Sequence, residues 1–156
     1  MPKKIIASIC ALLLLTAGLT GCSGAKQTDI PLNELYNKIE ETGLLPEMTE
    51  VDSAAMENVY GIDGTKLADH VFFVSEDTAL SDEVAIFKVN DPGYAEILYG
   101  VLVSRVEAKA RMAEGYSAEE YAKCKKTSVV RSGQYVYYIV NSGYDTLMRL
   151  VRSYIG

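Results

Sequence analysis

Arg105 is the side chain whose position most clearly suggests chemistry. If residues 92–114 form a helix, a spacing of 100° per residue places Arg105 in the middle of an apolar arc that includes Leu98, with Lys109 beside it. A guanidinium that faces a core is costly unless a carboxylate pairs with it. Glu83 is the candidate partner, because strand alternation would put it on the same face as other core-facing residues.

Three interpretations of Arg105 are open at this point. It forms a structural ion pair with Glu83, or it buries its aliphatic stem and keeps its head in solvent, or it lines a pocket for an anionic ligand. The first two are favoured equally and above the third, because lone inward-facing arginines are usually structural. A guanidinium more than about 6 Å from every carboxylate would exclude the ion pair.

No catalytic residue is assigned. His70 is the only histidine, which excludes an imidazole-rich metal site, and it precedes an apolar strand as a strand-end residue would. Cys124 fits a small packing residue better than a nucleophile paired with His70. The chain has no Gly-rich phosphate loop and no zinc-spaced Cys/His set, so no cofactor is expected.

An acidic loop could be considered as a calcium site. It lacks the alternating oxygen ligands and the central glycine of calcium loops, so solvated charges are favoured and no metal is expected. Its acidic members are Glu76, Asp77, Asp82 and Glu83.

The aromatic residues are dominated by tyrosine, with 11 Tyr against 3 Phe and no Trp. Tyr135, Tyr137 and Tyr138 share one predicted strand, so both of its faces carry a ring. If only one face of the sheet is covered, the other meets solvent or a partner, and tyrosine suits protein or glycan contacts. These three residues are the candidate partner surface; the alternative is that tyrosine simply serves a half-wet strand.

The N-terminus has the pattern of a lipoprotein signal peptide over residues 1–21. Lys3 and Lys4 precede an apolar stretch over 5–17, and Leu-Thr-Gly-Cys at 19–22 matches a lipobox. Cys22 is the expected lipidation site, with acyl chains such as palmitate. Residues 22–28 then form a lipidated tether of about 20 Å when extended, which leaves residues 29–156 as a single domain at the extracytoplasmic face of the cell membrane.

The net negative charge of the predicted mature chain limits the kinds of partner that it can attract. Without Lys3 and Lys4 the mature chain has 13 basic residues against 21 acidic ones. An acidic domain has no electrostatic attraction to nucleic acid or to anionic lipid. Nucleic-acid binding is therefore not expected, and the lipid anchor alone must hold the domain at the membrane.

The elements that position these residues indicate an α+β domain. We predict a four-stranded, mainly antiparallel sheet with its helices packed on one face, and the order strand, strand, helix occurs twice. Helices are predicted over 31–42, 54–60, 92–114, 118–126 and 145–155, and strands over 71–74, 84–89, 128–131 and 135–140.

Three stretches, 82–89, 102–105 and 133–136, give the chain a family resemblance. It resembles small lipoproteins of clostridia-like Gram-positive bacteria catalogued as a domain of unknown function of the DUF4358 type. The resemblance covers nearly all of the mature chain and implies a location and a shared fold. It implies no activity.

The expected function is therefore a binding or interaction module at the cell envelope, with an envelope protein or a glycan as partner. The alternative is a receptor for a small anionic ligand with its pocket at Arg105. An envelope hydrolase that uses a carboxylate pair ranks third.

Overall fold

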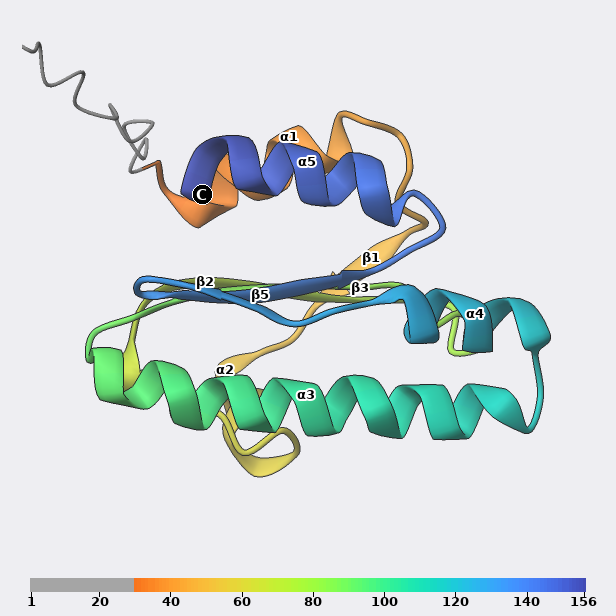
Figure 1. The fold of residues 1–156 in the computed structure, drawn as a ribbon, viewed down its shortest axis with the longest axis horizontal. Coiled ribbons are helices and arrows are strands. Elements are labelled where there is room, and N and C mark those ends of the chain that lie inside the picture. Colours follow the sequence, from red (N-terminus) through yellow and green to blue (C-terminus); the bar gives the residue numbers. More distant parts are fainter. Residues whose placement is uncertain (1–29) are drawn as a thin grey trace, which may run out of the picture.

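The computed structural model describes residues 30–156, which form one sheet with helices packed against it (Figure 1). The predicted signal peptide, Cys22 and the whole predicted tether lie outside the described residues. The elements are α1 (Leu32–Glu40), β1 (Met48–Glu50), α2 (Ser53–Asn58), a 3-10 turn (Gly64–Lys66), β2 (Leu67–Ser75), β3 (Glu83–Val89), α3 (Pro92–Glu114), α4 (Ala118–Lys126), β4 (Val130–Ser132), β5 (Tyr135–Val140) and α5 (Tyr144–Ile155).

The sheet is antiparallel throughout, in the order β1-β2-β3-β5-β4. The prediction of an α+β fold with an antiparallel sheet is confirmed, but the sheet has five strands and not four. The strand that was missed is β1, an edge strand in which Met48 pairs with Ser75 and Glu50 pairs with Phe73. Three residues with two exposed polar side chains carry no readable alternation.

Helices cover both faces of the sheet, which corrects the prediction that they pack on one. Figure 1 shows α1 and α5 on one side and α2 and α3 on the other. Side chains of β3 alternate between two separate cores: Val84 and Ile86 pack under α1 and α5, whereas Ala85 and Phe87 pack against α3. The domain is therefore a three-layer structure with the sheet in the middle.

The expectation of an open tyrosine-rich face is wrong for the same reason. Tyr135, Tyr137 and Tyr138 are all buried. The first two belong to the core under α5 and the third to the core under α3. Every residue of β5 is buried, as befits a strand covered on both faces. These tyrosines are core residues.

The repeated strand, strand, helix order is not a repeat in space. A two-fold axis that exchanged the antiparallel neighbours β3 and β5 would keep the two following helices on the same face of the sheet. The structure instead places α3 and α5 on opposite faces (Figure 1). The two halves share only an order of elements.

Three of the helices begin at a side-chain cap. The side chains of Asp52, Asp91 and Ser117 each accept a hydrogen bond from a backbone N–H in the first turn of α2, α3 and α4. The start of α1 has no such cap of its own, and Asp69 of β2 accepts from the Leu32 N–H at 2.8 Å. None of the helices within residues 30–156 is long and apolar enough to cross a bilayer.

Candidate functional site

The candidate site is centred on Glu83, the first residue of β3. Its side chain is fully buried and lies on the face of the sheet that α3 covers. The register of β3 and β5 sets Tyr138 opposite Ala85, two positions along the strand from Glu83 and on the same face. The Tyr138 hydroxyl donates a hydrogen bond to Glu83 Oε1.

The structure brings Arg105 and Glu83 together. Arg105 Nε lies 2.5 Å from Glu83 Oε1 and Nη2 lies 2.5 Å from Oε2, so the guanidinium and the carboxylate meet as two parallel forks. The guanidinium also stacks on the Tyr60 ring, 4.1 Å from its centroid. The Arg105 side chain keeps 21% of its exposure, so its outer edge reaches the surface.

Lys109 completes this cluster one helical turn after Arg105. Its Nζ lies 2.7 Å from Glu83 Oε2, and its side chain keeps 18% of its exposure. Two cations thus share one carboxylate, and the cluster of Glu83, Arg105 and Lys109 has a formal charge of +1. The helical projection had placed Lys109 beside Arg105, but gave no reason to assign it to the same carboxylate.

Burial and the charges of the cluster shift the pKa values of Glu83 and Tyr138. Burial by itself would raise the pKa of Glu83, but the hydrogen bonds from Arg105 and the charge of Lys109 outweigh it and hold that pKa below its usual value. Burial, followed by the nearby Glu83 charge, raises the pKa of Tyr138 well above its usual value. Glu83 is therefore a carboxylate, and Tyr138 a neutral donor, across the ordinary pH range.

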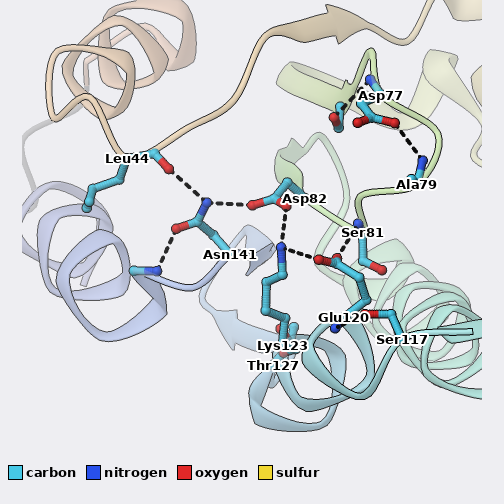
Figure 2. Close-up of polar contacts among 12 residues, drawn as sticks. Leu44, Asp77, Ala79, Ser81, Asp82, Ser117, Glu120, Lys123, Thr127 and Asn141 are labelled. Carbon is cyan, nitrogen blue, oxygen red and sulfur yellow. Dashed lines mark hydrogen bonds and ion pairs between the residues drawn. The ribbon is translucent and has the colours of Figure 1, made fainter. Parts of the chain in front are cut away.

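Figure 2 shows a second polar cluster, which was not predicted and which includes Asp82, the residue before Glu83. Lys123 Nζ lies 2.8 Å from Asp82 Oδ2 and 2.7 Å from Glu120 Oε1. Asn141 donates to Asp82 Oδ1 at 2.6 Å, and Glu120 Oε2 accepts from the Ser81 N–H at 2.6 Å. The cluster of Asp82, Glu120 and Lys123 has a formal charge of −1, and it joins α4 to the loop before β3.

The acidic loop is therefore only partly solvated, which corrects the sequence-based expectation. Asp82 and Glu83 are buried in the two clusters, whereas Glu76 and Asp77 are exposed. Glu76 accepts a hydrogen bond from the Thr49 hydroxyl of β1, and Asp77 accepts one from the Ala79 N–H in the same loop. Within residues 30–156, no group of three or more His, Cys, Asp and Glu side chains is arranged to hold a metal ion.

His70 and Cys124 both lie in the apolar interior or at its margin. His70 is half-buried inside β2, opposite Phe87, and their rings stack at 6.4 Å. Cys124 is buried in the core that faces α3, and burial raises the pKa of its thiol. A raised pKa disfavours the thiolate, which is the nucleophilic form.

A groove along α3, beside the end of α2, opens onto the Glu83 cluster. It has a volume of about 660 Å³ and is lined by Val59, Tyr60, Ile97, Gly100, Val101, Ser104, Arg105, Ala108, Lys109 and Met112. Five large hydrophobic side chains among the described residues are exposed, and three of them line this groove: Val59 at 71%, Ile97 at 62% and Met112 at 72%. The groove is thus apolar along its walls and cationic where Arg105 and Lys109 reach it.

Acid is expected to destabilise the domain through Glu83 and Glu120. Burial would raise the pKa of Glu120, but its hydrogen bonds with Lys123 and Ser81 hold it below the usual value, as in Glu83. A glutamate whose pKa is lower in the folded than in the unfolded state stabilises the folded domain. This stabilisation is complete above the ordinary glutamate pKa of about 4.3, and it is lost as the pH falls through the pKa of the folded state.

Urea unfolding between pH 3 and pH 7 should show this loss as a steep acid limb. The variant Glu120→Gln should have a shallower limb, and Glu119→Gln, which changes an exposed neighbour, is the matched control. Parallel curves for the wild type and Glu120→Gln would contradict the assignment of part of the acid limb to Glu120.

Comparison with known proteins identifies a family. A family model described as "Domain of unknown function (DUF4358)" matches residues 41–141. The match spans the whole sheet and helices α2, α3 and α4, and therefore both polar clusters and the groove, but neither α1 nor α5. It is narrower than the resemblance over nearly all of the mature chain that the sequence suggested. No curated protein and no solved structure matches the chain.

Proposed function

The chain belongs to the family described as Domain of unknown function (DUF4358), and we propose that it is a lipid-anchored binding module of the cell envelope that receives its partner in the groove on α3. The proposed function is the one expected from the sequence, but the proposed binding surface is the α3 groove instead of the tyrosines of β5. The tyrosines of β5 are buried, whereas the groove is open to solvent.

The observation that carries the proposal is the grouping of exposed apolar side chains with two cations in one groove. Val59, Ile97 and Met112 come from two separate segments of the chain and line one groove. Contiguous exposed apolar surface on a folded domain marks a site of interaction more often than scattered single residues do. Arg105 and Lys109 give this surface the polar contacts that fix the orientation of a partner.

The envelope location rests on the N-terminal pattern, with Cys22 as the acylated residue. A short tether would hold the domain near the membrane surface, where a partner in the same membrane has a high effective concentration. An acylated binding domain therefore needs only a modest intrinsic affinity.

A receptor for a small anionic ligand is the second candidate, and the +1 charge of the cluster at Arg105 favours it. It is weaker because sites for small molecules are usually enclosed and bury most of the ligand, whereas the walls of this groove are largely exposed. A hydrolase that uses a carboxylate pair has less support, since Asp82 and Glu83 are both held by cations.

Site-specific photocrosslinking in the source cells tests the proposal. A photoreactive phenylalanine derivative is placed at Met112 or Ile97 in the groove, or at the exposed Ser153 on α5 as the matched control. We expect a discrete adduct from both groove positions and none from position 153. The same adducts from all three positions, or none from the groove, would refute the proposed site.

A further inference from the structure

We infer that the occupant of the α3 groove is an amphipathic helix of a partner protein that carries a carboxylate on its apolar face. This inference rests on the proposed function and names the chemistry of its partner. It is drawn from the shape of the groove, from the distribution of charge along it and from the unused hydrogen-bond donors at its floor.

The shape of the groove suits a helix. Its α3 floor consists of two adjacent rows of residues spaced four apart, one of them beginning with the small residues Gly100, Ser104 and Ala108. Small residues lower the ridge of a helix and let a second helix approach closely. From Ile97 to Met112 the floor extends roughly 22 Å, or about four turns. An open groove of this length matches the helix-in-groove mode of recognition.

The second row sets the chemistry of the occupant. It runs Ile97, Val101, Arg105, Lys109, so its first half is apolar and its second half is cationic. A helix bound along it would place apolar side chains against Ile97 and Val101. It would place an acidic side chain about two turns further on, beside Arg105 and Lys109.

The two cations have hydrogen-bonding capacity left for such a carboxylate. Arg105 bonds Glu83 through Nε and Nη2, and Lys109 bonds it through one of the three donors of its ammonium group. Glu83 is the one carboxylate that lies within ion-pair distance of either cation among residues 30–156. The cluster therefore keeps a formal charge of +1 that a second carboxylate would neutralise.

The same features disfavour a second copy of this chain and a fatty acid. A second copy would bring another +1 cluster to the middle of the interface, where like charges oppose association. A fatty acid would satisfy the cations but leave much of its chain in water, because the groove is open. Both remain outcomes that the experiment can detect.

Three synthetic helices test the inference. They are amphipathic peptides of about 18 residues, roughly 27 Å long, that differ only at the centre of the apolar face, which carries Glu, Gln or Lys. Binding to the full mature protein in zwitterionic lipid nanodiscs is measured by fluorescence anisotropy, with empty nanodiscs as the blank. We expect the Glu peptide to bind about tenfold tighter than the Gln peptide, the effect of one charged hydrogen bond, and the Lys peptide to bind most weakly.

Variants of the protein assign the preference to the groove. Lys109→Met should remove most of the difference between the Glu and Gln peptides, and Lys109→Arg should restore it. Arg105 still compensates Glu83 in both variants, so the fold is retained. Lys125→Met, which removes an exposed lysine of α4, is the control and should leave the preference unchanged.

The failures of the inference and of the proposed function can be told apart. The inference of an acidic helix is overturned if the three peptides bind equally or none of them binds. It is also overturned if oleate binds more tightly and the peptides cannot displace it, or if the protein forms a dimer that Ile97→Glu abolishes. If adducts still form at Met112 and Ile97, the groove remains a binding site. Loss of those adducts overturns the proposed function itself.

Discussion

Replacing Glu83 with glutamine is expected to lower the free energy of unfolding by about 3–5 kcal/mol. The amide keeps the size of the side chain but removes the charge that Arg105 and Lys109 share. Two partly buried cations would then lie 2.5–2.7 Å from a neutral group, with their desolvation no longer offset. Urea unfolding at pH 7, followed by circular dichroism, measures the change.

The matched control is Glu96→Gln, the same substitution at an ion pair of the same length. Glu96 Oε2 lies 2.5 Å from Arg131 Nη1, but both side chains are largely exposed. Water and salt screen such a pair, so the control should lose no more than about 1 kcal/mol. Equal losses in the two variants would show that burial of the Glu83 cluster contributes nothing to its strength.

The pairing of Arg105 with Glu83 could be predicted because two periodicities converge on it. The helical spacing of residues 92–114 turns Arg105 inward, and the alternation of β3 turns Glu83 toward the same layer. Each signal is local, and a buried charge needs a partner wherever the helix lies on the sheet. The predicted starts of α3 and α4 were correct for a similar reason, since their caps are set within one turn.

Two features were missed, one through a wrong interpretation and one because the sequence carries no signal for it. The strand Tyr135–Val140 was interpreted as having one open face, although its unbroken apolar run is typical of a strand buried on both. The second polar cluster joins Asp82, Lys123 and Asn141 across three segments with no common spacing. Neither the periodicity of α4 nor that of β5 indicates this meeting.

The two clusters differ in net charge and in how far they reach the surface. Asp82 and Glu83 are neighbours at the start of β3, and each is neutralised by a different helix: Glu83 by α3 and Asp82 by α4. The −1 cluster beneath α4 is enclosed, whereas the +1 cluster reaches the surface at the α3 groove. The excess positive charge is therefore held at the one of these two places that is open to solvent, where the proposed partner would bind.

Replacing Cys22 with alanine is expected to abolish fatty acylation of the protein. The Cys22 thiol is the group that accepts the lipid in the predicted lipobox, and alanine has no nucleophilic group to replace it. The wild type should incorporate an alkyne analogue of palmitate in growing cells, and incorporation into Cys22→Ala should fall to background. Two or three acyl chains attach a protein durably to the membrane, whereas a single chain binds only marginally. The intact mass of the mature wild-type protein should therefore correspond to a chain that begins at residue 22 and carries more than one acyl chain.

Labelling is a more direct measurement than cell fractionation, because it detects the acyl chain itself. The matched control is Cys124→Ala, which removes the buried thiol of α4 and should leave labelling unchanged. Equal labelling of Cys22→Ala and the wild type, or a wild-type mass with a free thiol at residue 22, would contradict the lipid anchor. The high effective concentration that the anchor provides for binding in the α3 groove would then be lost from the proposed function.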